Sequence, residues 1–125
     1  MGIFTKEKKT LADMKFNELE KVKKEAIQVI KIIRKKIEPA RMHPENNEIV
    51  KESLQQMIRS IAAIRSVISN QINKTDSVKA KGILLAQIEL ANASEEKLEI
   101  ALDPNQILNI KPLNEFISFV ESAKF

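Results

Sequence analysis

Basic side chains recur along residues 21–35 at the spacing of one helix face. Four lysines fall on one stripe, flanked by Lys23 and Arg34, and a row of cations can neutralise successive phosphates of a polyanion. The N-terminal lysines would extend this surface. The residues predicted to form a polyanion-binding surface are Lys8, Lys9, Lys21, Lys24, Lys31, Arg34 and Lys35. A helix face that is exposed to solvent and binds nothing would show the same spacing. Glu20 and Glu25, which interrupt the row of basic residues, favour that alternative.

Four carboxylates cluster near residue 100, at Glu95, Glu96, Glu99 and Asp103. Like charges four residues apart on a helix repel each other by about 0.2–0.5 kcal/mol, so this row favours water or a cationic partner. It is compatible with a solvated face, with a salt-bridged contact to a basic surface, or with a divalent-cation site. We treat these residues as a candidate acidic docking stripe.

Groups suited to enzymatic catalysis are scarce. The only histidine, His43, has no serine or aspartate at a helical spacing, whereas a catalytic triad needs such partners. The chain has no cysteine, and its two glycines are too far apart to form a phosphate-binding loop. One histidine cannot supply the paired Glu-x-x-His motifs of a di-metal bundle. We therefore expect a protein that is not an enzyme, with no catalytic residue, cofactor or metal.

The net charge of +4 conceals a gradient along the chain. Residues 1–41 carry twelve Lys or Arg and six acids, whereas residues 83–125 carry three and seven. This asymmetry predicts either a polyanion site at the basic end or two faces that attract each other. Without Trp or Tyr for base stacking, nucleic acid would be held through its backbone phosphates.

The chain contains no cysteine, so no disulfide ties it to an oxidising compartment. The first residues of the chain lack the apolar run of a signal peptide. We therefore expect a cytoplasmic protein. Residues 1–9 are expected to form a basic arm, and residues 10–125 a single helical domain. Ile3 and Phe4 in this arm are only two apolar anchors, so contact with an anionic membrane surface would be weak.

Two glycines and four prolines leave little material for the turns of a sheet, so composition favours helices. A first helix is predicted from about Thr10 to Ile37, with Thr10 and Asp13 as an approximate capping box and Pro39 as its stop. The second helix carries a heptad seam of the kind found in coiled coils. The seam consists of Val50, Leu54, Met57, Ile61, Ile64 and Ile68.

A third helix is predicted after Thr75, Asp76 and Ser77, any of which can cap it, and its apolar character predicts the most buried element. The small residue Gly82 would let another backbone approach closely. Ser94, followed by two acids, also suits a new N-cap, so this helix either continues or divides there. A short helical turn is predicted after Asp103, ended by Pro112. The last helix, about 113–123, places five apolar residues on one stripe, namely Leu113, Phe116, Ile117, Val120 and Ala123.

The predicted fold is all-α, an antiparallel helical bundle of three long helices plus a shorter C-terminal helix, four or five helices in total. The leading functional hypothesis is a non-enzymatic interaction or assembly protein. It would self-associate or dock a protein partner through apolar helix faces and the charge gradient. The alternative is a small nucleic-acid-binding subunit that contacts backbone phosphates through the first helix and the arm.

Overall fold

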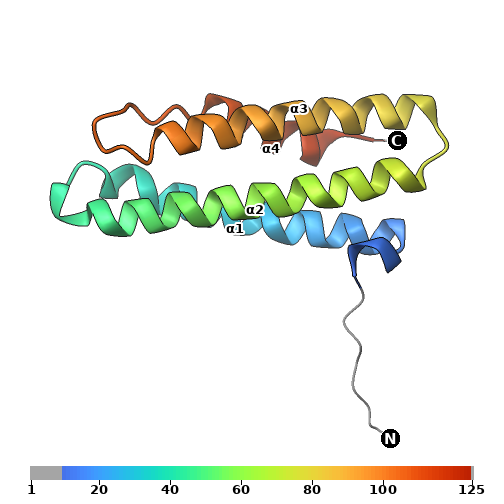
Figure 1. Ribbon diagram of the computed structural model, residues 1–125, viewed down its shortest axis with the longest axis horizontal. Helices are drawn as coiled ribbons and strands as arrows, with labels where there is room; N and C mark the ends of the chain where they lie inside the picture. The colour runs from blue at the N-terminus through green and yellow to red at the C-terminus, as the bar shows by residue number, and fades with distance from the viewer. Residues whose placement is uncertain (1–9, 125) are drawn as a thin grey trace, which may run out of the picture.

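The computed structural model describes residues 10–124, and within them the chain forms four α-helices and two short 3-10 turns. The helices are α1 (Phe16–Ala40), α2 (Asn47–Lys74), α3 (Val78–Ile100) and α4 (Lys111–Ser122). The 3-10 turns, Leu11–Asp13 and Pro44–Asn46, precede α1 and α2. The predicted all-α bundle is confirmed, and the count of helices in the described part is four (Figure 1).

Both ends of α1 differ from the prediction. Thr10 and Asp13 do interact, with the hydroxyl donating to the carboxylate at 2.7 Å, but they flank the 3-10 turn rather than the start of the long helix. At the other end α1 continues through Pro39 to Ala40, so Pro39 does not end it one turn earlier. The backbone N–H of Arg41 still donates to the carbonyl of Ile37, which completes the last turn.

The heptad seam of α2 is confirmed. All six predicted seam residues are buried, and Val67 joins them, while Ile58 and Ile72 are partly buried against the core. A stripe wider than a two-position seam lets one helix pack against two neighbours. α2 therefore holds α1 on one side and α3 on the other.

α3 is one continuous helix through Ser94. The Ser94 side chain is buried, and its hydroxyl donates to the carbonyl of Leu90 at 2.8 Å instead of capping a new helix. Of the three candidate caps, Ser77 is the one used, since its hydroxyl accepts from the N–H of Ala80 at 3.2 Å. The prediction that α3 is the most buried element is wrong, because Val78, Leu85 and Ile100 are exposed. Gly82 faces open space, because no described atom other than those of the adjoining residues lies within 4 Å of the position a Cβ atom would take, so the expected close backbone approach is not found among the described residues.

The segment 101–110 forms turns and extended chain, not the predicted short helix. Asp103 does accept from the N–H of Asn105 through its side chain and of Gln106 through its carbonyl, which builds a turn. Pro112 lies in the first turn of α4 rather than ending an earlier helix. Four of the five residues of the apolar stripe predicted for the last helix are buried, whereas Ala123 lies just after the helix and is only partly buried.

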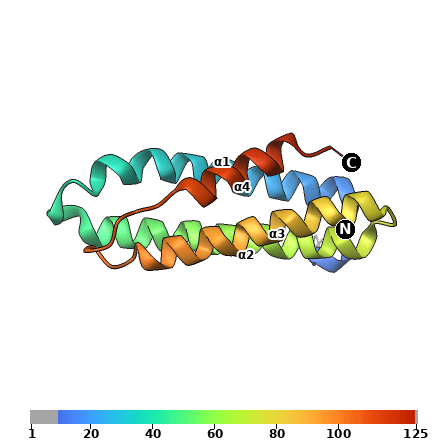
Figure 2. The ribbon, with the colours of Figure 1, turned by 90° about the horizontal axis from the view of Figure 1, so that it is seen from above.

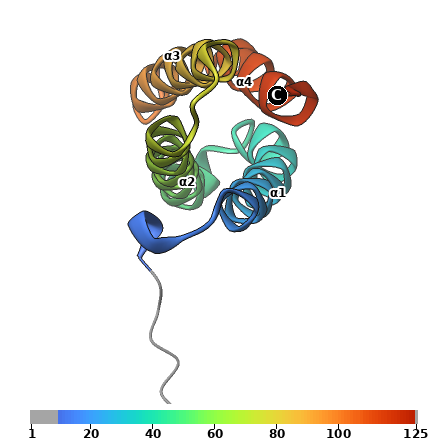
Figure 3. The same cartoon turned by 90° about the vertical axis from the view of Figure 1, so that its right-hand side faces the viewer.

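The helices run alternately up and down, and each packs along the helix next to it in the chain (Figures 1 and 2). Viewed from its end, the bundle places α1 and α3 diagonally, with α2 and α4 between them (Figure 3). The edge between α1 and α4 is bridged by polar side chains. Lys31 pairs with Glu121 at 2.6 Å, and Arg34 donates to Asn114. None of the described helices has the length and apolar character needed to cross a membrane.

Candidate interaction surfaces

The predicted polyanion-binding residues of α1 divide into two groups. Lys21, Lys24 and Lys35 are exposed and form no ion pair with another described residue. Lys31 and Arg34 instead bridge to α4. The other two predicted members, Lys8 and Lys9, lie outside the described residues. The surface available to a partner is therefore narrower than the sequence pattern suggests.

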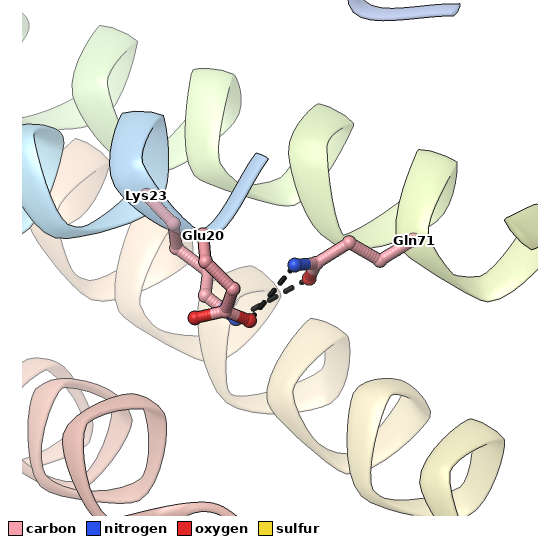
Figure 4. A network of polar contacts seen from close by, with 3 residues as sticks. All are labelled: Glu20, Lys23 and Gln71. Carbon is pink, nitrogen blue, oxygen red and sulfur yellow. Dashed lines mark hydrogen bonds and ion pairs between the residues drawn. The ribbon is translucent and has the colours of Figure 1, made fainter. Parts of the chain in front are cut away.

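Lys23, which sequence spacing placed at the flank of this surface, lies in the core with 1% of its surface exposed. Its ammonium donates to the Oε1 atom of Glu20 at 2.9 Å and to the side-chain carbonyl of Gln71 on α2 at 3.3 Å. The amide of Gln71 donates to the same Glu20 oxygen at 2.8 Å, which closes a three-residue network (Figure 4). The expectation that Lys23 faces solvent is wrong, and this lysine joins α1 to α2.

Gln87 of α3 is a second buried polar residue near this level of the bundle. Arg65 donates to Asn92 at 3.0 Å, so these two residues lie at the same level of the antiparallel pair α2 and α3. Moving six residues along α2 from Arg65 reaches Gln71, and the corresponding position on α3 is close to Gln87. Both polar atoms of the Gln87 side chain are buried without a hydrogen-bond partner in the described part of the chain.

An exposed apolar residue interrupts the basic outer face of α1. Ile32 has 55% of its surface exposed and lies on the same stripe as Lys21 and Lys35. Because the core-facing stripe of α1 already contains its neighbours Ile30 and Ile33, Ile32 must point away from the core. We call Lys21, Gln28, Ile32 and Lys35 the α1 outer face.

The residues of the predicted acidic stripe also fall into two groups, one on the side of α3 that faces α2 and one away from it. Glu95 forms an ion pair with Arg65 of α2, so this carboxylate is neutralised within the chain. Glu99 lines a shallow groove beside Arg59, also on the α2 side. Glu96 and Asp103 are exposed, Asp103 in the turn after α3.

The outward side of α3 carries further residues that were not predicted. Glu89 is exposed and lies seven residues, or about two helical turns, before Glu96. Leu85 and Ile100 are exposed on the same side of the helix. We call Leu85, Glu89, Glu96, Ile100 and Asp103 the α3 outer face. The seven-residue spacing of Glu89 and Glu96 is the sequence pattern that could have identified it.

The two outer faces lie on opposite sides of the bundle, because α1 and α3 are diagonal (Figure 3). One face is basic and the other acidic, and each carries an exposed branched aliphatic side chain. Such an arrangement can bind partners of opposite charge on two separate sides of one molecule.

Two grooves lie between α1 and α4. One has a volume of about 170 Å³ and includes Lys24 and Gln28 in its walls, and the other, at the bridges from Lys31 and Arg34, is open and measures about 510 Å³. His43 is exposed in the loop before α2, with its Nδ1 atom 3.5 Å from the carboxylate of Glu45. Among the described residues, no group of three or more acidic or histidine side chains is arranged to hold a metal ion.

Comparison with protein-family models, with curated proteins and with solved structures finds no match for this chain.

Proposed function

We propose that this protein is a non-enzymatic interaction or assembly module that associates through its outer helix faces. The observation that supports the proposal is the pair of oppositely charged faces on α1 and α3. Each face has an exposed large aliphatic residue, Ile32 with 55% and Leu85 with 53% of its surface exposed. We also propose a cytoplasmic location, the ordinary setting for a chain without cysteine.

The energetics favour use of these faces as contacts. A single exposed aliphatic residue is ordinary, but fully burying an Ile or Leu against a partner contributes about 1.5–3 kcal/mol. Charged residues around such a contact contribute mainly to orientation and to the rate of encounter. An apolar residue flanked by charge of one sign therefore selects a partner face with an apolar residue and the opposite charge.

The test compares three forms of the chain, the wild type, Ile32→Gln and Ile107→Gln. Ile107 is 87% exposed in the loop before α4 and belongs to neither outer face, so its replacement is the matched control. Sedimentation velocity measures association of the chain alone, and mass spectrometry quantifies the proteins retained by the immobilised chain. We expect Ile32→Gln to reduce association or retention and Ile107→Gln to leave both unchanged. Identical behaviour of the three forms would contradict the proposal.

The second candidate function is binding to the phosphate backbone of nucleic acid. It is supported by the ammonium groups of Lys21, Lys24 and Lys35, which are exposed and form no ion pair with another described residue. It is weakened by the engagement of Lys31 and Arg34 with α4. Fluorescence anisotropy with a labelled duplex tests it. The expected result is affinity that falls steeply with salt and is insensitive to sequence, with a smaller salt dependence after Lys21, Lys24 and Lys35 are all replaced by Gln. An unchanged salt dependence in that triple variant would exclude this surface.

A further inference from the structure

We infer that the partner of the α1 outer face is the α3 outer face of a second copy of this chain, docked with the two helices parallel. The inference rests on the proposed function and adds the identity of the partner. It follows from three features of the described residues: the complementary charges, the spacing of the apolar residues, and the diagonal placement of α1 and α3.

The spacing of residues matches along both faces. Lys21 precedes Ile32 by eleven residues, and Glu89 precedes Ile100 by the same number. Eleven residues make about three helical turns, or about 16 Å, so each pair lies on one side of its helix. When Ile32 contacts Ile100 in a parallel alignment, Lys21 comes level with Glu89. One contact thus brings an apolar pair and an ion pair together.

The same alignment pairs two more positions. Gln28 comes level with Glu96, where its amide can donate to the carboxylate, and Lys35 lies at the end of α3 that leads into the turn with Asp103. Glu25, an exposed acid beside the α1 outer face, comes level with Ala93 and therefore meets no like charge. All charged positions of the outer faces are then opposite an unlike charge or a neutral residue.

An antiparallel alignment is less complementary. It can place Ile32 against Leu85 and Lys21 against Glu96, but it then brings Lys36 against Lys81, and both are exposed. The like charges would repel each other. The charge pattern therefore favours the parallel alignment.

The geometry of the bundle determines what such docking builds. α1 and α3 run in the same direction within one chain, so parallel docking relates neighbouring copies mainly by translation (Figure 1). The two faces differ and lie on opposite sides, so every copy that docks through α1 still presents a free α3 face. A contact of this kind forms an open chain of copies rather than a closed dimer.

A charge exchange tests the alignment by sedimentation velocity over a range of concentrations at low salt. The wild type is expected to form species larger than a dimer that grow with concentration. Lys21→Glu alone and Glu89→Lys alone should each weaken association about tenfold, because each places like charges together. The double variant Lys21→Glu/Glu89→Lys should recover it. The matched control Lys21→Glu/Glu96→Lys keeps the same net charge and should stay weak.

The absence of cysteine in the sequence permits a second test, which reports which positions of neighbouring copies meet rather than how tightly the copies bind. Ile32→Cys combined with Ile100→Cys should give a ladder of covalent multimers on oxidation, because docking brings the two positions of neighbouring copies together. Ile32→Cys combined with Val78→Cys is the control, since Val78 is exposed on α3 but far from the contact. This control should give no ladder. Circular dichroism establishes that the variants are folded.

Three outcomes would overturn the inference: a wild type that is monomeric at all concentrations, association that stops at a dimer, or a double charge variant that stays weak. A monomeric wild type whose immobilised form still retains a protein through Ile32 would remove this inference and leave the proposed function standing. A wild type that neither self-associates nor retains another protein would contradict both this inference and the proposed function.

Discussion

The network of Glu20, Lys23 and Gln71 makes an asymmetric prediction about stability. Replacing Glu20 by Ala removes the counter-charge of an ammonium group that has 1% of its residue surface exposed, and leaves it one hydrogen bond, to Gln71. Breaking a buried ion pair from one side costs about 3–5 kcal/mol. Because the Glu20 side chain is 29% exposed, we expect the lower end, about 3 kcal/mol, for Glu20→Ala.

Replacing Lys23 by Met should cost far less. The substitution removes the buried charge and keeps an unbranched side chain, while Glu20 retains its hydrogen bond from Gln71 and its contact with water. Substitutions of a buried charge by an apolar residue of similar volume are often neutral, so we expect a change within about 1 kcal/mol. The double variant Glu20→Ala/Lys23→Met should then be more stable than Glu20→Ala alone.

Thermal and urea unfolding, followed by circular dichroism at 222 nm, measure these differences. With an unfolding entropy of about 2.1 cal/mol/K per residue, a loss of 3 kcal/mol lowers Tm by about 11 °C for a domain of this size. Equal losses for Glu20→Ala and Lys23→Met would refute the reasoning. So would a double variant no more stable than Glu20→Ala.

Three further predictions concern α3 and α4. Gln87→Leu should raise the free energy of unfolding by about 1–2 kcal/mol, because it removes two buried polar atoms that have no hydrogen-bond partner among the described residues. A lower urea midpoint for the variant would contradict this prediction. Gly82→Ala should add about 1 kcal/mol, because the helix gains propensity and the new methyl group meets open space; thermal unfolding checks it. Phe116→Ala should cost about 3–5 kcal/mol by opening a cavity where α4 meets the core, and a change below 1 kcal/mol would show that α4 is not packed as described.

The sequence predicts well those parts of the fold in which the residue pattern of a single helix face determines which side chains are buried. The seam of α2 and the stripe of α4 repeat apolar residues with helical period, and burial of those residues follows directly. The cap at Ser77 is equally local, because its hydroxyl bonds to an N–H three residues later.

The errors arise where a residue has two local options and packing decides between them. Ser94 suits an N-cap, but its neighbours Ala91 and Leu98 are buried against α2, so the helix continues and the hydroxyl bonds back to Leu90. The segment after Asp103 has a helix-start pattern, yet Ile107 finds no core to pack against and stays 87% exposed. α1 continues past Pro39 and ends beside Arg41, whose guanidinium donates hydrogen bonds to the backbone carbonyls of Ala101 and Gln106. These partners are far from Arg41 in the sequence, so the sequence pattern around Pro39 does not predict the contact.

The candidate surfaces were only partly predictable, because charge spacing does not show depth or partners. Lys23 lies four residues after Leu19 and four before Ile27, both buried, and this position within the apolar stripe was the available indication of its burial. The bridges from Lys31 and Arg34 to α4 join residues far apart in the chain, so no pattern within α1 predicts them. The exposed position of Ile32, by contrast, follows from the phase of the helix.

The packing of each helix along its neighbour in the chain has a consequence for the order of folding. The turns between α1 and α2 and between α2 and α3 are short, so both hairpins close with little loss of chain entropy and before any distant contact is needed. The longest closure, between α1 and α4, combines the core that both helices share with the polar bridges from Lys31 and Arg34. We therefore expect fast folding in which α4 docks last, and amide hydrogens of α4 that exchange sooner than those of α2.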